Sequence, residues 1–552
     1  MTRVSAGILR CALAAILLAE SAALAVAGVM HPVAGDPVRI DSGLVAGTLL
    51  GHGVKAYLGV PFAAPPVRQN RWRPPRPVAP WTGIYTADTR RPECMQPLRS
   101  SDINHYFGEE AISEDCLYLN VWAPERARAG DNLPVVVWIY GGAFSIGSAT
   151  SPAYAGAPLA RKGVVYVAAN YRVGPLGFLA LPQLTAESAR HASGDWGLLD
   201  QIAALHWVQR NIRAFGGNPA NVTVAGQSAG SMSINILQAS PLAAGLFRRL
   251  IGMSGSTVLR DSMIQIPSLA QAEAEGEKLE RAMHTTSLTQ MRALSSDRLL
   301  AIARQAHARA MPDVDGYVLP ENPRAIFEAG RQADVPILVG STANDIGTDI
   351  PLRKASTPQQ YRDLAATAFG SAAATFLQLW PADSDAAAAR RAQEVARDSG
   401  FGLAAISWAT LQATTGKAPA YVYMFARIPP FAPGVTFSDF DPATAGAYHM
   451  SDVPYWLGSY PAFNLFRVTR DWTPLDRSLS EKMQDVIVAF AKTGDPGTAD
   501  VEFRRFEPGT PWRTVFGDTV HLQKLNAKGV QFLLEHPPAA VARPPQAPRT
   551  AF

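Results

Sequence analysis

The sequence predicts an α/β fold in which a large, mostly parallel central sheet is covered by helices, with further helical insertions. Short apolar runs recur along the chain, and segments of helical periodicity separate them. A pentapeptide of the form Gly-x-Ser-x-Gly lies between one such run and a helical segment. Strands that alternate with helices over this length imply parallel pairing through crossover helices.

The predicted strands are rich in β-branched and aromatic residues. A continuous apolar run that ends at two glycines, such as residues 135–140 (VVVWIY), is typical of a strand buried on both faces. The candidates are residues 135–140, 164–169, 222–225, 250–253, 336–339 and 421–425, and a further one lies near the C-terminal end at 520–522.

Helical periodicity is clearest after the second strand candidate. The sequence Gly-Gly-Asn-Pro at 216–219 ends a stripe of apolar residues at positions 198, 202, 205, 208 and 212. Residues 231–237 predict another helix. Residues 262–334 and 352–415 are alanine-rich and lack strand-like runs, so we expect helical insertions rather than a separate domain.

The N-terminus predicts a secretory signal peptide. Arg3 and Arg10 flank the start of an apolar stretch at residues 11–18, and small residues follow, so cleavage is expected after Ala25 or Ala27. An uncleaved anchor helix is the alternative, but a membrane span requires about 20 apolar residues. We therefore expect a secreted or periplasmic protein without a stable membrane anchor.

The predicted organisation is a signal peptide at residues 1–25, one domain at residues 26–535 and a disordered, proline-rich tail at residues 536–552. Length alone would suggest three or four domains, but large single α/β domains often depart from that expectation. No linker-like composition divides the chain.

The charge pattern argues against nucleic acid as a partner. Lys and Arg number 50 and Asp and Glu 46, which gives a net charge of +4, and no Lys/Arg-rich run occurs. Binding to phosphate backbones requires clustered cations. The sequence leaves the oligomeric state open.

Cysteine usage agrees with export. The three cysteines are Cys11, Cys94 and Cys116, and removal of the signal peptide leaves an even pair in an oxidising compartment. A Cys94–Cys116 disulfide is one outcome, and two free buried thiols are the other. Two cysteines without a His-Glu-x-x-His motif give no basis for a zinc site, so no metal is predicted.

Residues 226–230 (GQSAG) supply a candidate nucleophile. They follow the strand candidate at 222–225 directly and precede a helix, which is the setting of a nucleophile elbow. Small residues must flank the serine in so tight a turn, and the helix N-terminus favours developing negative charge. Ser228 is therefore the candidate nucleophile, and an ordinary glycine-rich turn is the alternative.

A serine nucleophile needs a base, and the base needs an acid that orients it. The order along the chain after such an elbow is serine, acid, histidine. His449 lies in a loop after a predicted strand and is therefore the candidate base. Of the other histidines beyond Ser228, His284 and His307 lie in the helical insertion, His521 in a predicted strand and His536 in the tail.

The acid is expected at the end of the strand candidate at 336–339. Asp345 is the first carboxylate there, and Asp349 is its rival. An acid in this place fixes the tautomer of the imidazole.

Backbone amides for a developing oxyanion are expected from two places. Ala229 follows the nucleophile, and the loop at residues 140–144 (YGGAF) contains glycines that let the backbone approach a substrate closely. A plain turn is the alternative for the glycine pair.

Several motifs together resemble the type-B carboxylesterase family, which includes the cholinesterases. Residues 113–122 (SEDCLYLNVW) are similar to a highly specific family signature. Further similarity lies at 58–63 (LGVPFA), 70–75 (NRWRPP), 170–178 (NYRVGPLGF) and 490–496 (FAKTGDP). The resemblance extends from about residue 38 to about residue 522 and points to a secreted member of bacterial type.

The resemblance implies an α/β-hydrolase fold and a serine carboxylic-ester hydrolase that forms an acyl-enzyme on a small-molecule ester, without a cofactor. It implies a triad of Ser228, Asp345 and His449. It implies oxyanion donors at Gly142, Ala143 and Ala229. It also implies a Cys94–Cys116 disulfide and an Arg71–Glu114 ion pair.

The chain departs from the family pattern at three places. Gln227 stands where family members usually carry Glu, Ala143 replaces the third glycine of the oxyanion loop, and Asp345-Ile346 stands in place of Glu-Gly. The neutral Gln227 favours neutral esters over cationic ones. A hydrolase of amides or carbamates is the nearer alternative; a non-catalytic binding module is disfavoured by the retained serine, base and glycines.

Overall fold

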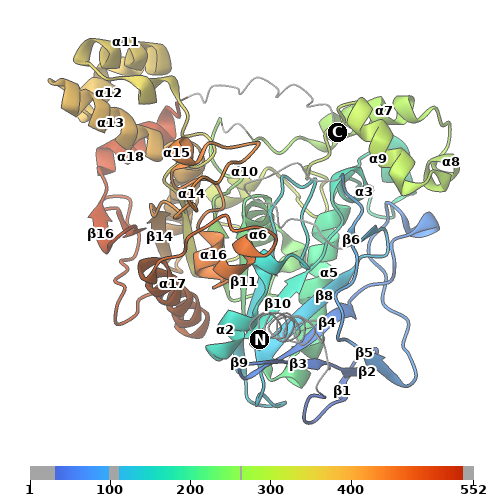
Figure 1. Ribbon diagram of the computed structural model, residues 1–552. Helices are drawn as coiled ribbons and strands as arrows, with labels where there is room; N and C mark the ends of the chain where they lie inside the picture. The colour runs from blue at the N-terminus through green and yellow to red at the C-terminus, as the bar shows by residue number, and fades with distance from the viewer. Residues whose placement is uncertain (1–31, 98–110, 262–263, 539–552) are drawn as a thin grey trace, which may run out of the picture.

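The computed structural model describes residues 32–97, 111–261 and 264–538 (Figure 1). The predicted signal peptide and residues 539–552 of the predicted tail lie outside these residues.

An 11-stranded sheet forms the centre of the molecule, with the strand order β16-β15-β14-β13-β12-β11-β9-β10-β8-β4-β3. The strands from β15 to β10 in this order are parallel, whereas β16 at one edge and β8, β4 and β3 at the other pair antiparallel. The strands are β3 (Thr48–Gly51), β4 (Val54–Pro61), β8 (Tyr118–Pro124), β9 (Leu133–Ile139), β10 (Val165–Ala169), β11 (Gly217–Gln227), β12 (Arg249–Met253), β13 (Ile337–Thr342), β14 (Ala420–Phe425), β15 (Trp512–Phe516) and β16 (Val520–Lys524).

The central strands are covered on both faces. Every residue of β10, β13 and β14 is buried, although successive side chains of a strand point to opposite faces. Helices α5 (Trp196–Asn211), α6 (Ala229–Ala239), α14 (Gly400–Thr415) and α17 (Pro474–Thr493) pack on the sheet. The predicted architecture, a mostly parallel sheet covered by helices, is confirmed.

The structure also contains strands that the sequence analysis did not predict. Before β9, the additional strands of the central sheet are β3, β4 and β8. Two small sheets also precede β9. One contains β1 (Val38–Ile40), β2 (Gly43–Ala46) and β5 (Ile84–Thr86), and the other contains β6 (Glu93–Cys94) and β7 (Ile112–Ser113). Strand β15 is also additional. All seven predicted runs overlap observed strands of the central sheet.

The two alanine-rich segments are helical and lie on opposite sides of the view in Figure 1. The first contains α7 (Leu269–Met283), α8 (Leu288–Ala293) and α9 (Ser296–Gln305), which we call the α7–α9 lobe, and then α10 (Pro323–Glu328). The second contains α11 (Pro358–Phe369), α12 (Ala373–Leu379), α13 (Asp385–Arg397) and α14. Shorter helices are α2 (Ala157–Arg161), α3 (Gly174–Phe178), α4 (Pro182–Glu187), α15 (Pro442–Ala445), α16 (Val453–Trp456) and α18 (Ala527–Glu535).

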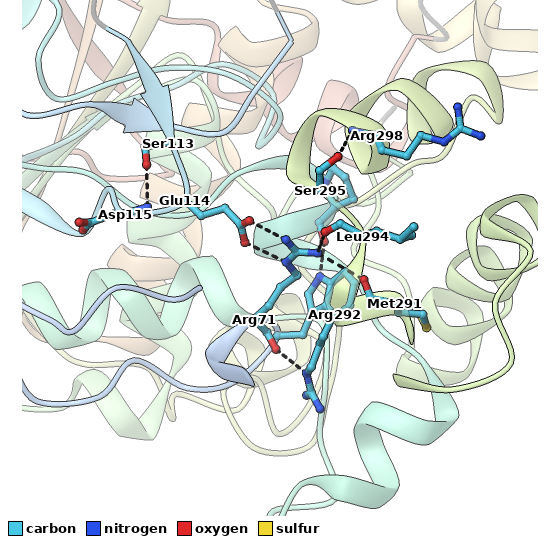
Figure 2. Close-up of polar contacts among 11 residues, drawn as sticks. Arg71, Ser113, Glu114, Asp115, Met291, Arg292, Leu294, Ser295 and Arg298 are labelled. Carbon is cyan, nitrogen blue, oxygen red and sulfur yellow. Dashed lines mark hydrogen bonds and ion pairs between the residues drawn. The ribbon is translucent and has the colours of Figure 1, made fainter. Parts of the chain in front are cut away.

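Buried arginines join the α7–α9 lobe to the rest of the molecule (Figure 2). Arg71 forms the expected ion pair with Glu114, at 2.5 and 2.8 Å, and also donates to the carbonyls of Met291 and Leu294. The Nε of Arg292, on α8, donates in return to the carbonyl of Arg71 at 3.1 Å. Because the ion pair and these hydrogen bonds provide partners for the guanidinium groups of Arg71 and Arg292, both groups can remain buried.

Candidate active site

Ser228 sits in a strained turn between β11 and α6. Its φ is +58° and its ψ is −124°, a conformation that residues with a Cβ rarely adopt. The backbone N–H of Ser228 donates to the carbonyl of Met253 on the neighbouring strand at 2.8 Å. Ser228 itself is only partly buried.

The two flanking glycines are required by close backbone contacts. A Cβ on Gly226 would lie 2.5 Å from the carbonyl oxygen of Gly230, and one on Gly230 would lie 2.1 Å from that of Ile139. No side chain fits at either position without moving the backbone. This explains why small residues bracket Ser228 two positions away on each side.

His449 faces Ser228 from a loop that follows β14. The distance between His449 Nε2 and Ser228 Oγ is 2.9 Å. Asn344 fixes this loop, because its side-chain oxygen accepts from the N–H of Ala447 and its N–H donates to the Ala447 carbonyl, each at 3.0 Å. The candidate base is thus positioned by Asn344, the residue just before the candidate acid.

Asp345 follows β13 and contacts the other side of the same imidazole. Its Oδ1 lies 2.7 Å from His449 Nδ1, and its side chain is fully buried. The backbone N–H groups of Thr342 and Ile346 donate to its two oxygens at 2.9 and 2.8 Å. Asp349, the rival, is exposed. The structure therefore brings Asp345, and not Asp349, to His449.

The charged form of Asp345 is favoured despite its burial. Burial by itself raises the pKa of this carboxyl, but the charge and hydrogen bond of His449 and the donors around it outweigh that effect, so the pKa lies below its ordinary value. Asp345 can therefore orient the imidazole as an anion and stabilise the imidazolium when it forms.

The glycine-rich loop after β9 lies against the elbow. A Cβ on Gly141 would lie 2.8 Å from the Cβ of Ser228, which shows how closely the two segments approach. Gly142 and Ala143 have φ values of +124° and +54°. Within the described residues, the amides of Gly142, Ala143 and Ala229 donate no hydrogen bond to a protein group. Free amides beside the nucleophile are suited to an oxyanion.

Two further residues near the imidazole were not given a role by the sequence analysis. The buried Asp452 accepts from the hydroxyl of Tyr423 at 3.0 Å. Burial, followed by the negative charge of Asp345, raises the pKa of Asp452 to about 6. The buried ring of Phe401 lies 5.5 Å from that of His449, centroid to centroid. Only the position of Asp452, three residues after the base, could have drawn attention to it.

Gln227 is a third neighbour of the base. Its side-chain Nε2 lies 3.2 Å from His449 Nε2, and Gln227 is almost fully buried. The sequence singles out this position as a departure from the family pattern, but it does not predict the contact with His449.

Further observations concern the cysteines, the other histidines, candidate metal ligands and the described helices. Cys94 and Cys116 form a disulfide, so they are not free thiols. Among the histidines in the described residues, His449 is the one for which a hydrogen bond to Ser228 is observed, whereas none is observed for His284, His307 or His521. Among the described residues, no three His, Cys, Asp or Glu side chains are grouped as metal ligands, and none of the described helices is long and apolar enough to span a membrane.

Comparisons with known proteins show the family of the chain. The carboxylesterase family matches residues 35–533. The fumonisin B1 esterase of Sphingopyxis macrogoltabida is 38% identical over 70% of this chain and 71% of its own length. The para-nitrobenzyl esterase of Bacillus subtilis is 33% identical over 86% and 93%, respectively. A human cocaine esterase is 32% identical over 84% of both chains.

The fold agrees as well. A solved structure of a PNB esterase superposes with a TM-score of 0.73 at 30% identity, covering 90% of this chain and 99% of the other. The fold is therefore that of the α/β-hydrolases. The chain belongs to the carboxylesterase family and is a carboxylic ester hydrolase.

Proposed function

We propose that the protein hydrolyses neutral carboxylic esters with Ser228 as nucleophile, His449 as base and Asp345 as the orienting acid. The observation that carries this proposal is the chain of hydrogen bonds from Ser228 Oγ through His449 to Asp345, at 2.9 and 2.7 Å. A nucleophile, a base within reach of its proton and an acid behind the base are what acyl transfer requires.

Ser228 Oγ attacks the ester carbonyl carbon while its proton passes to His449 Nε2. The amides of Gly142, Ala143 and Ala229 stabilise the oxyanion of the tetrahedral intermediate. The intermediate collapses, the alcohol leaves with the proton from His449, and an acyl-enzyme remains. Water then attacks the acyl-enzyme as His449 takes its proton. The second tetrahedral intermediate collapses with release of the carboxylic acid, and His449 returns the proton to Ser228 Oγ.

The first test is the replacement Ser228→Ala. Loss of the nucleophile should lower kcat by about 10⁴-fold to 10⁶-fold and abolish covalent labelling by an organophosphate, while the fold is retained. The exposed Ser371→Ala is the matched control and should label like the wild type. Labelling that persists in Ser228→Ala would overturn the assignment.

The preference for neutral esters is supported by charge. A carboxylate beside the nucleophile would favour a cationic alcohol group by roughly 1 kcal/mol or more, but Gln227 is neutral. No Trp occurs between Cys94 and Cys116, where cholinesterases offer an aromatic face to a quaternary ammonium. Both features disfavour choline esters.

Two isosteric substrates test this preference. We expect kcat/KM for butyrylcholine to be lower than for its neutral isostere, 3,3-dimethylbutyl butyrate. The variant Gln227→Glu should improve the choline ester only modestly, because an aromatic partner is still lacking. A ratio above one in the wild-type enzyme would show that another part of the pocket binds cations.

We also propose that the protein is exported. The predicted signal peptide supports this, and so does the Cys94–Cys116 disulfide, because disulfides persist in oxidising compartments and are rare in the cytosol. The named substrates of the relatives and a series of p-nitrophenyl esters of increasing chain length are the first compounds to assay.

A further inference from the structure

Two side chains converge on one nitrogen of the candidate base. Ser228 Oγ lies 2.9 Å from His449 Nε2, and Gln227 Nε2 lies 3.2 Å from the same atom. The opposite ring nitrogen, Nδ1, is 2.7 Å from the carboxylate of Asp345. The imidazole is therefore contacted through both nitrogens, and one of them has two partners.

These contacts fit a neutral imidazole that carries its proton on Nδ1. With a proton on Nδ1 that is donated to Asp345, the neutral imidazole has a single lone pair on Nε2. The hydroxyl of Ser228 and the amide of Gln227 can both donate toward it. A hydrogen bond to the neutral form of a base opposes its protonation. An ionised glutamate could only accept, and it would favour the imidazolium instead.

We propose that Gln227 is a positioning residue that holds His449 in its neutral, proton-accepting form and thereby extends esterase activity to lower pH. The inference rests on the proposed function, because it requires His449 to be the base. It differs from the substrate preference argued above, since it concerns the protonation of the enzyme and applies to uncharged substrates as well.

The buried setting of Gln227 supports a fixed role. The Gly141 position, in the oxyanion loop, is crowded by this residue: a Cβ there would lie 2.4 Å from the Gln227 carbonyl oxygen and 3.0 Å from its Oε1. The side chain is 2% exposed, so the loop covers it rather than solvent. An amide held in this way has little freedom to turn away from the base.

Other groups also face His449 and must be taken into account. Asp345 lies on the acid loop, Asp452 on the loop of His449 itself, and the uncharged Phe401 on α14. Ser228 comes from the elbow, and Tyr423 on β14 donates to Asp452. Because Asp345 and Asp452 are unchanged in variants of Gln227, their effects are common to all the profiles compared.

The experiment measures kcat/KM for a neutral p-nitrophenyl ester between pH 5 and pH 9. We expect Gln227→Glu to move the midpoint of the acid limb upward by about one pH unit, since a carboxylate at this separation favours the imidazolium. Gln227→Met, which is similar in length but cannot donate, should move it in the same direction by less. KM above the midpoint should change little in either variant.

The outcomes separate this inference from the proposed function. If Ser228→Ala loses activity but the three profiles superimpose, Gln227 does not govern the base, and only the inference fails. A downward shift in Gln227→Glu would also overturn it. If Ser228→Ala stays active, the proposed function fails first. Should Gln227→Glu not fold, the direction of the shift in Gln227→Met still decides the question.

Discussion

Replacing Asp345, the proposed acid, is the sharpest test of how the proposed base, His449, is held. Asp345 accepts from His449 and from two backbone amides, so an isosteric amide would disturb every contact of the buried group. We expect Asp345→Asn to lower kcat by about 10³-fold to 10⁴-fold with little change in KM, because the imidazole would take the wrong tautomer.

Asp349→Asn is the matched control. This residue is four positions further along and exposed, so its replacement should leave kcat within a few-fold of the wild type. Steady-state kinetics on one neutral ester check both variants. A large loss in Asp349→Asn together with a mild one in Asp345→Asn would mean that Asp349, and not Asp345, is the acid.

Some features of the candidate site can be predicted from the sequence at the level of single residues, and others cannot. Ser228 and His449 could be proposed from chain order and from their places at strand ends. The contact of Gln227 with His449 and the anchoring of Ala447 by Asn344 could not, because they join segments more than 100 residues apart. Such contacts depend on the relative position of two distant loops, and a local sequence pattern does not determine that position.

Among the secondary-structure elements, the start of α5 has an unusual electrostatic environment. Asp195 precedes this helix, and its Oδ1 accepts from the N–H of Asp313 at 3.2 Å. Both carboxyl groups are buried, and no cation in the described part of the chain pairs with either. Burial, followed by the charges of Asp313 and Asp315, raises the pKa of Asp195 well above its ordinary value. Burial, followed by the charges of Asp315 and Glu273, does the same for the pKa of Asp313.

The sign of the resulting pH dependence follows from linkage. A carboxyl whose pKa is raised on folding binds a proton in the folded state at a pH where the unfolded chain has lost it. Its contribution to stability is therefore present below about pH 4 and is lost as the pH rises toward the raised pKa. The slope is up to about 1.4 kcal/mol per pH unit for each such proton.

We expect Asp195→Asn to weaken this dependence, because the amide keeps the acceptor oxygen and removes one of two charges. Thermal unfolding measured from pH 5 to pH 8.5 should show a smaller fall in Tm than in the wild type. The exposed Asp383→Asn serves as control and should follow the wild type. If calcium ions instead raise the Tm of the wild type alone, the pair binds a cation rather than a proton.

The elements also differ in how well their sequences predicted them. The central strands were predicted because continuous apolar runs mark strands buried on both faces. The small sheets before β9 were missed because β1 and β5 have three residues and β6 and β7 two, too few to show a period. Their pairing depends on distant partners rather than on local propensity.

For the whole molecule, the Cys94–Cys116 disulfide closes a loop of 22 residues in sequence separation. In the chain-entropy model such a crosslink stabilises the folded state by about 3 kcal/mol. We expect the double variant Cys94→Ser/Cys116→Ser to unfold a few degrees below the wild type in a thermal scan. The wild-type enzyme made in a reducing cytosol should match the double variant, and oxidation should restore its stability.

The proposed export gives a second prediction at this scale. The mature protein recovered from the periplasm or the medium should begin at Val26 or Gly28, as N-terminal sequencing would show. A chain that is recovered with residues 1–25 still attached would support the anchor alternative instead.

The backbone of Ser228 has a consequence for natural selection. A positive φ is unfavourable for serine but ordinary for glycine, so Ser228→Gly should be more stable than the wild type by about 1 kcal/mol while being inactive. A homologue that no longer needs the esterase activity would gain stability from the single substitution Ser228→Gly. The chain therefore has a lower folding stability than it could have, because the proposed nucleophile needs a hydroxyl at position 228. Substitutions that raise stability at this position would remove the proposed activity.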